Sequence, residues 1–388
     1  MSKWKTVKLG EVGVIITGNT PKTSDKENYL TNNISFYKPS DIVENNVSYL
    51  NSSEAYVSEV ARSKVRMLPK GSILVTCIGI IGKIGILEHE ATFNQQINAI
   101  IPNQDICLNR YIAYSIFFNR DRLRDIANAP VVPIVNKTQF SNMIIPLPPL
   151  EEQKHIADIL DKASNLIDLR KQQLEKMDLL VKSKFIDMFG DPVTNPNEWQ
   201  LVPLMETGSC KNGMNFRSNE FGVEIHCLGV GDFKDLSVIE DTYNLLTISL
   251  NEMPTSEYLL QDGDIVFVRS NGNKALVGRC LAIYPGRIPT TYSGFCIRYR
   301  KSVDNISTKY LLQVFKAPSM RKQIAGRGAN IQNLNQQILS QINIPVPPIE
   351  LQNQFTSFVE QIEKQKAVMQ KSLEKMGTNY KALMQEYF

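Results

Sequence analysis

Apolar residues recur in alternating steps of four and three along residues 151–189. This spacing is a heptad pattern, which predicts a helix that packs lengthwise against another helix. Pro148 and Pro149 precede the pattern and Gly190 follows it, as expected at the start and end of a helix. We therefore predict one helix over 151–189, about 55–60 Å long. Its predicted coiled-coil packing positions are Ile156, Leu160, Ile167, Leu174, Met177 and Val181.

Residues 344–388 repeat this pattern without a gap. The proline box recurs at 345–348, and the tetrapeptide Leu-Glu-Lys-Met occurs in both predicted helices, at 174–177 and at 373–376. Two unrelated surface helices of similar composition are the alternative, but the agreement of proline box, heptad and tetrapeptide favours an internal repeat. Because a helix of this length needs a partner, we predict that the two helices pack on each other. The packing positions in the second helix are Phe355, Val359, Ile362, Met369, Leu373 and Met376.

The segments outside the helices also repeat, with lower sequence identity. Both contain short β-rich runs that are separated by Gly, Pro and Asn turns. Trp199 stands where Trp4 stands, and residues 259–268 parallel the run through residues 71–78. The predicted fold class is therefore α+β, with two β-rich globular domains separated by two long helices in a pseudo-two-fold internal repeat. The predicted domains are 1–145 (globular), 146–190 (helix), 191–343 (globular) and 344–388 (helix).

Composition narrows the class of protein without naming a function. A chain of 388 residues suggests two or three domains, and its formal net charge of +4 is too small to indicate nucleic-acid binding by itself. The six cysteines lie apart from one another, which favours reduced thiols and argues against a zinc site. The first ten residues do not resemble a signal peptide, and no apolar run is long enough to span a bilayer. We expect a soluble cytoplasmic protein.

Catalytic motifs are absent from the sequence. Residues 79–83, Gly-Ile-Ile-Gly-Lys, are too short for a phosphate-binding loop and lack the following Ser or Thr, so a tight turn is the better interpretation. The three histidines show no metal-binding spacing, and His155 is expected on the solvent face of the first long helix. No Asn-Pro-Pro-aromatic motif for base methylation occurs. We therefore expect no catalytic residue, metal or cofactor in this chain.

Basic and amide residues gather in predicted loops of both globular domains. Lys and Arg neutralise phosphates, whereas Asn, Gln and Arg pair with base edges. Each cluster alone is typical of a solvated surface, but recurrence in two equivalent domains favours DNA binding. For Gln95 and Gln96 the alternative is that one of them satisfies buried backbone, and for Lys137 it is a charge near a helix cap. The predicted DNA-binding residues are Lys38, Ser40, Lys83, Gln95, Gln96 and Lys137 in the first domain, and Arg269, Asn271, Asn273, Lys274, Asn330 and Gln332 in the second.

These motifs resemble those of one protein family. The box at 145–153 and its copy at 344–352 resemble the entry to the long helices of type I restriction–modification specificity subunits. Residues 71–83 and 94–95 resemble parts of the first target recognition domain of that family, and residues 185–192 resemble its helix exit. The resemblance covers the whole chain. The second globular domain departs most, because it has Ser-Gly where the first has Gln95-Gln96 and Arg-Ser-Asn where the first has Cys-Ile-Gly.

The resemblance implies a function for the whole chain. Each recognition domain would bind one half of a split, asymmetric double-stranded DNA site, and the two helices would pair as an antiparallel coiled coil that sets the spacer. Two modification subunits would dock on the chain and methylate adenine with S-adenosylmethionine. Restriction subunits would add translocation and cleavage driven by ATP with Mg. None of these cofactors would be bound by this chain. The alternative is a coiled-coil scaffold whose globular domains bind protein partners rather than DNA.

Overall fold

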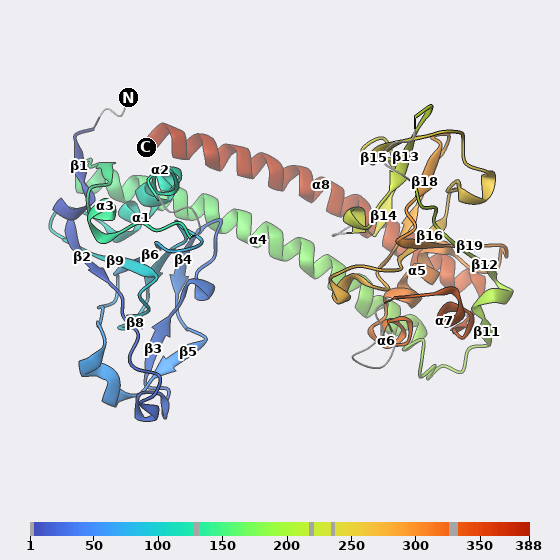
Figure 1. The fold of residues 1–388 in the computed structure, drawn as a ribbon, viewed down its shortest axis with the longest axis horizontal. Coiled ribbons are helices and arrows are strands. Elements are labelled where there is room, and N and C mark those ends of the chain that lie inside the picture. Colours follow the sequence, from blue (N-terminus) through green and yellow to red (C-terminus); the bar gives the residue numbers. More distant parts are fainter. Residues whose placement is uncertain (1–3, 128–131, 217–220, 234–236, 326–332) are drawn as a thin grey trace. The chain divides into compact units, whose positions relative to one another are not determined.

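The computed structural model describes residues 4–127, 132–216, 221–233, 237–325 and 333–388 (Figure 1). The chain forms two compact units, of which unit 1 comprises residues 1–172 with 370–388 and unit 2 comprises residues 173–369. Each unit therefore contains one globular part and a portion of both long helices.

Unit 1 is built on a mixed five-stranded sheet. The strand order is β2-β9-β6-β7-β4, in which β4 is parallel to β7 and the other neighbours are antiparallel. A second sheet has the order β5-β3-β8, and β1 pairs with β10. The strands are β1 (Thr6–Lys8), β2 (Gly13–Thr17), β3 (Ile34–Tyr37), β4 (Val47–Leu50), β5 (Ala55–Val57), β6 (Ile73–Thr76), β7 (Ile84–Leu87), β8 (Thr92–Phe93), β9 (Ile97–Pro102) and β10 (Ile144–Pro146). The short helices are α1 (Asn109–Phe118), α2 (Arg120–Asp125) and α3 (Lys137–Ser141).

Unit 2 repeats this topology strand for strand. Its sheets have the orders β12-β19-β16-β17-β14, β15-β13-β18 and β11-β20. The strands are β11 (Leu201–Pro203), β12 (Gly208–Asn212), β13 (Val223–Leu228), β14 (Val238–Ile239), β15 (Leu246–Leu250), β16 (Asp264–Val268), β17 (Cys280–Ile283), β18 (Thr290–Tyr292), β19 (Cys296–Lys301) and β20 (Asn343–Pro345). The short helices are α5 (Thr308–Lys316), α6 (Pro318–Ile324) and α7 (Gln336–Ser340). The internal repeat predicted from the sequence is confirmed, as is the α+β fold class.

The central strands are buried on both faces because each sheet lies between two apolar layers. In β6, Ile73 and Val75 point into the cluster that contains Tyr111 of α1. Leu74 points to the opposite face, where it packs with Tyr37 and other residues of the smaller sheet. This alternation follows from the two-residue period of a strand. In unit 2, β16 alternates in the same way between two clusters.

The long helices are α4 (Leu150–Phe189) and α8 (Ile349–Tyr387), and α4 begins one residue before its predicted start. Their first turns are fixed by a buried glutamine. Gln153 accepts a hydrogen bond from the Leu108 N–H at 2.8 Å and donates to the carbonyl oxygens of Pro148 (2.8 Å) and Ile106 (3.0 Å). We name this arrangement the glutamine clamp. It ties the proline box and the helix start to the globular part.

The glutamine clamp is duplicated in unit 2. Gln352 accepts from the Ser307 N–H at 2.8 Å and donates to Pro347 (2.8 Å) and Asn305 (3.1 Å). Both glutamines are fully buried. Beside each clamp a tyrosine hydroxyl, of Tyr111 or Tyr310, donates to a proline carbonyl at 2.9 Å. The two units thus hold their long helices with the same bonds.

In each unit the two long helices run antiparallel. In unit 2, Phe189 near the end of α4 lies against Phe355 near the start of α8, with ring centroids 5.5 Å apart, while Asp178 forms an ion pair with Lys366 further along. In unit 1, the start of α4 shares a buried cluster with the last turns of α8, including Met384. The predicted packing positions divide by burial. Ile156, Leu160, Val181, Phe355, Val359 and Ile362 are buried, whereas Ile167, Leu174, Met177, Met369, Leu373 and Met376 are half-buried.

Phe388, the residue after α8, packs against the core of unit 1. The ring of Phe388 lies 5.3 Å from that of Tyr111 and 5.8 Å from that of Phe118, measured between centroids. The predicted domain boundaries at 145 and 343 fall inside β10 and β20, so the beginning of each proline box is a strand of the globular part.

Candidate nucleic-acid interface

Three turns of unit 1 converge through backbone hydrogen bonds. The Cys77 N–H donates to the Gln96 carbonyl at 2.8 Å, and the Val135 N–H donates to the Cys77 carbonyl at 2.8 Å. A bridge between Ile78 and Ile134 extends this contact. We define the first loop cluster as residues 77–83, 94–96 and 133–137. It brings together Lys83, Gln95, Gln96 and Lys137, which the sequence predicted as DNA contacts.

Lys83 also ties a fourth turn to this cluster. Its ammonium donates to the Pro39 carbonyl at 3.1 Å. Pro39 lies between Lys38 and Ser40, whose side chains are both exposed. The turn is fixed by Asp41, which accepts from the Lys38 N–H at 2.6 Å. Lys83 therefore positions the Lys38–Ser40 turn, in addition to any contact with a phosphate.

The two glutamines have different surroundings. Gln95 is exposed, and its side-chain oxygen accepts a hydrogen bond from the Thr20 hydroxyl. Gln96 is half-buried, and its side-chain oxygen accepts from the Asn94 amide at 2.9 Å. Asn94 also accepts from the Gln96 N–H at 3.1 Å, so Gln96 helps to shape its own turn. Because Gln95 is the exposed one, it is the better base-reading candidate of the two glutamines. The predicted contact Lys137 is also exposed, and it is the first residue of α3.

The second loop cluster occupies the equivalent place in unit 2. We define it as residues 269–276, 293–295 and 333–334. The Arg269 N–H donates to the Phe295 carbonyl at 2.8 Å, and the Leu334 N–H donates to the Arg269 carbonyl at 2.8 Å. Although the backbone bonds repeat those of the first cluster, the side chains differ.

The polar side chains of this second cluster partly build the turn itself. The Arg269 guanidinium donates to the Gly294 carbonyl at 3.2 Å. Asn271 accepts from the Asn273 N–H at 2.7 Å, and Asn273 accepts from the Ala275 N–H at 3.0 Å. Asn273 is exposed, whereas Arg269 and Asn271 are half-buried. Predicted contacts Asn330 and Gln332 lie outside the described residues, as does the side chain of Lys274.

Exposed apolar side chains in the loop clusters were not predicted, and they include Ile80, Ile134 and Phe295. Ile80 is 52% exposed between Gly79 and Gly82, and Phe295 is 60% exposed beside Arg269. Apolar side chains in such positions can contact the methyl group of thymine. The sequence signal that could have identified Ile80 and Phe295 is an apolar residue next to a glycine in a predicted turn.

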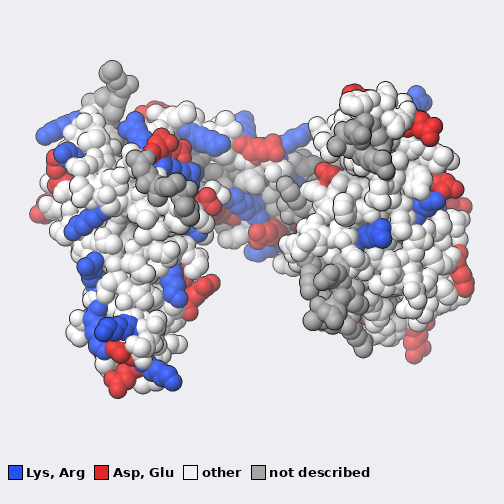
Figure 2. All heavy atoms as spheres, in the orientation of Figure 1, with Lys and Arg blue, Asp and Glu red and all other residues white. Residues whose placement is uncertain are grey.

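The surface charge is mixed. Figure 2 shows Lys and Arg interspersed with Asp and Glu over the visible face, without one continuous basic patch. Recognition by this surface would thus depend on individual loop contacts more than on a uniform field.

No metal-binding cluster occurs within the part of the chain that the structure describes. No group of three His, Cys, Asp or Glu side chains among these residues could hold a metal ion. The six cysteines are free thiols, and burial raises the pKa of Cys77 and Cys227 to about 12. His155 is exposed on α4, as expected. No helix within the described ranges combines the length and the apolar character needed to cross a membrane.

Two copies of one sheet-and-helix domain, each with a polar loop cluster, define a duplicated recognition protein. The family model for the type I restriction modification DNA specificity domain matches residues 1–178 and 196–376. The chain belongs to this family of type I restriction–modification specificity subunits. The assignment favours DNA recognition over the alternative of a protein-binding scaffold.

Similar proteins have the same description. The MjaIX specificity subunit of Methanocaldococcus jannaschii is 29% identical over 57% of this chain, which spans 55% of that relative. The MjaVIII specificity subunit of the same organism is 27% identical over 78% of this chain and 73% of its own length. The StySPI specificity subunit of Salmonella potsdam is 24% identical over 98% of this chain and 87% of its own length.

Solved structures show the same fold. The S subunit of a type I system from M. genitalium aligns with a TM-score of 0.57 at 13% identity, over 100% of this chain and 96% of that one. A chain from a study of assembly and conformational transition of the type I system aligns with a TM-score of 0.61 at 17% identity, over 99% and 97%. Figure 1 shows the corresponding elements of this chain.

Proposed function

We propose that each globular part reads one half of a bipartite, asymmetric DNA site. The observation that carries this proposal is that the two units share their supporting hydrogen bonds but differ in the side chains of their loop clusters. The glutamine clamp and the loop-cluster backbone bonds are the same in both units. The loop side chains differ, with Cys77 in the first cluster at the place of Arg269 in the second. One framework with different side chains suits two different half-sites.

The long helices would set the spacer between the half-sites. α4 is a continuous helix of 40 residues, which corresponds to about 60 Å. Half-sites in successive turns of the major groove lie about 34 Å apart. A helix of this length is therefore sufficient to hold two reading domains over separate turns of one duplex.

The chain would act without chemistry of its own. In this proposal two modification subunits dock on it and methylate adenine with S-adenosylmethionine. Restriction subunits use ATP and Mg for translocation and cleavage. Because its target is DNA, we place the protein in the cytoplasm.

Methylome sequencing tests the proposal directly. A host that expresses this chain with its modification subunits is compared with the same host lacking only this chain. We expect a split adenine-methylated motif that vanishes on deletion. Replacing residues 1–145 with the equivalent part of a relative should change one half of the motif and leave the other. An unchanged methylome would contradict the proposal.

Salt dependence separates the proposal from the scaffold alternative. Binding to duplex DNA through several phosphates weakens steeply as salt rises, because bound counterions are released. A protein-binding scaffold would show no duplex binding at low salt. Electrophoretic mobility shift over 50–200 mM salt, a range in which phosphate contacts give about 10³-fold changes or more, distinguishes the two.

A further inference from the structure

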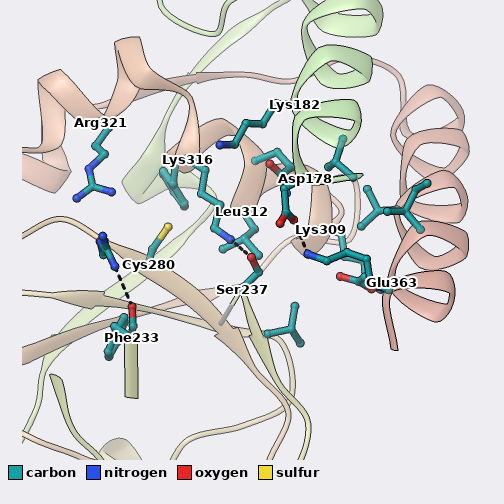
Figure 3. Close-up of a pocket in the computed structure, with 18 of the residues that line it drawn as sticks. Asp178, Lys182, Phe233, Ser237, Cys280, Lys309, Leu312, Lys316, Arg321 and Glu363 are labelled. Atoms are coloured by element: carbon teal, nitrogen blue, oxygen red, sulfur yellow. Dashed lines mark hydrogen bonds and ion pairs between the residues drawn. The ribbon is translucent and has the colours of Figure 1, made fainter. Parts of the chain in front are cut away.

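Unit 2 contains a cavity of about 780 Å³ at the place where α5 meets the sheet edge and the long helices (Figure 3). Its walls are rich in basic side chains. The lining residues include the cations Lys182, Arg279, Lys309, Lys316, Arg321 and Lys366 and the anions Asp178, Glu240 and Glu363.

Because the two units share one fold, the residues that line this cavity in unit 2 can be compared with the residues at the same positions in unit 1. In the register that aligns Tyr111 with Tyr310, Tyr114 corresponds to Gln313 and Phe117 to Lys316. The strand pairing also makes Tyr49 of β4 equivalent to Val238 of β14. Tyr49 pairs with Ile86 of β7, and Val238 pairs with Ala282 of β17. Gln313, Lys316 and Val238 all line the cavity. Unit 2 thus has shorter or charged side chains where unit 1 has aromatic rings.

Unit 1 uses those rings to close the same region. The hydroxyls of Tyr49 and Tyr114 donate to Asp161 at 3.0 and 2.6 Å. Phe117 is 8% exposed and lies under the Arg120 guanidinium, 4.1 Å from the ring centroid. The equivalent volume in unit 2 is open, and a lysine enters it in place of Phe117.

The Lys316 ammonium has a neutral hydrogen-bond acceptor at its tip. Its ammonium donates to the Ser237 hydroxyl, and burial lowers the pKa of Lys316. Desolvating an ammonium is unfavourable unless an anion compensates. The nearest acids, Asp178 and Glu363, offset part of this effect but are themselves matched by Lys366 and Lys309.

Arg321 adds a second cation to the same space. Its guanidinium donates to the Ala275 carbonyl at 2.6 Å. Its pKa is lowered first by burial and then by the neighbouring charge of Arg279. Arg279 in turn donates to the Phe233 carbonyl at 3.4 Å. Figure 3 shows Lys316 and Arg321 on either side of Cys280, with the Lys316 ammonium directed toward Ser237.

We propose that this cavity binds a phosphate group through Lys316, Arg321 and Arg279. Several cations that line one cavity together with a hydroxyl, that of Ser237, suit a tetrahedral anion with several acceptor oxygens. The cavity volume lies within the range of about 300–1,000 Å³ that is usual for small-ligand sites. The phosphate belongs either to a free phosphorylated compound or to the backbone of bound DNA. This site is separate from the base-reading loop clusters. A phosphate of bound DNA would rest on the proposed function, whereas a free phosphorylated compound goes beyond it.

Calorimetric titration of the full chain with inorganic phosphate and with pyrophosphate tests the site. The variants are Lys316→Gln and Arg321→Gln, and the matched control is Lys322→Gln, which removes an exposed lysine of α6. We expect each variant to weaken anion binding at least about tenfold and the control to leave it unchanged. Equal binding by all four proteins, or no binding by the unmodified chain, would overturn the proposal.

Lys316→Phe guards against misinterpreting a folding defect, because it installs the residue that unit 1 has at this place. We expect this variant to abolish phosphate binding while raising the unfolding temperature, since a desolvated charge is removed. A variant that unfolds at a lower temperature and still binds phosphate would also overturn the proposal.

Duplex DNA identifies the source of the phosphate. If the phosphate is part of the DNA backbone, Lys316→Gln weakens duplex binding and reduces the salt slope by about one. If it belongs to a free compound, duplex affinity is unchanged while phosphate binding is lost. Both results support the site. Duplex binding tests the proposed DNA-reading function, and the phosphate titration tests the phosphate site. Each proposal can therefore fail without the other.

Discussion

Removing the glutamine clamp should destabilise one unit by a predictable amount. Gln153→Leu keeps the side-chain volume but removes three hydrogen bonds, which leaves the Leu108 N–H and the carbonyl groups of Pro148 and Ile106 without this partner. Each buried polar group left in this way costs about 1–3 kcal/mol, and the added apolar surface of Leu offsets part of the total. We expect a loss of about 3–5 kcal/mol in the free energy of unfolding.

Tryptophan fluorescence during urea denaturation measures this loss. Trp4 and Trp199 are the two tryptophans, one in each unit. A Trp199→Phe background reports unit 1 through Trp4, and a Trp4→Phe background reports unit 2. Gln153→Leu should lower the midpoint of the first signal, and the equivalent Gln352→Leu should lower that of the second.

Gln172→Ala is the matched control, because Gln172 is an exposed glutamine of the same helix. It should change the free energy of unfolding by less than about 0.5 kcal/mol. If Gln153→Leu and Gln172→Ala shift the midpoint equally, the clamp does not hold the helix start, and the reasoning from its three hydrogen bonds is refuted.

Three further results are expected. Asp264→Asn removes a buried carboxylate that accepts two hydrogen bonds from Arg300 at 2.7 and 2.8 Å, so urea denaturation should show a loss of about 3–5 kcal/mol; an unchanged midpoint would contradict this. Burial raises the pKa of Cys77 and Cys227 to about 12, which keeps these thiols protonated below that pH; mass spectrometry should therefore detect iodoacetamide adducts on them at pH 8 only after unfolding, and rapid native labelling would refute their burial. Inserting four residues near Gln172 should change the spacer of the methylated motif while both half-sites stay the same, and a change in the half-site sequences would rule out the helix as the spacer.

The long helices could be predicted because several local signals agree. The heptad gives the packed face, the prolines give the start and Gly190 gives the end, so the predicted start differs from that of α4 by one residue. Gly190 has φ of 76°, a left-handed backbone conformation that glycine adopts without strain. Each signal arises within a few residues of chain, where sequence patterns are informative.

The glutamine clamp could not be predicted by the same reasoning. A glutamine in the first turn of a helix normally faces solvent, and its burial depends on residues 106–108, far away in the sequence. The internal repeat gave the one sequence indication of this role, because a glutamine recurs at the equivalent position, Gln352.

The loop clusters show a similar limit. The sequence identified Arg269 as a basic residue near a turn, but its guanidinium donates to the Gly294 carbonyl, a contact created by tertiary folding. Lys83 likewise reaches the Pro39 carbonyl in another turn. Composition locates such residues in loops, whereas the fold decides which part of each side chain supports the loop.

The closure of the unit 1 core by Phe388 has a consequence for synthesis on the ribosome. Tyr111 and Phe118 leave the ribosome long before Phe388, their aromatic partner, has been made. At about 5–20 residues per second, the roughly 270 residues from Phe118 to Phe388 take about 14–54 s to translate. Unit 2, residues 173–369, emerges entirely within that interval. Unit 1, the first to begin synthesis, is thus completed after unit 2, because its apolar face waits for residues 370–388.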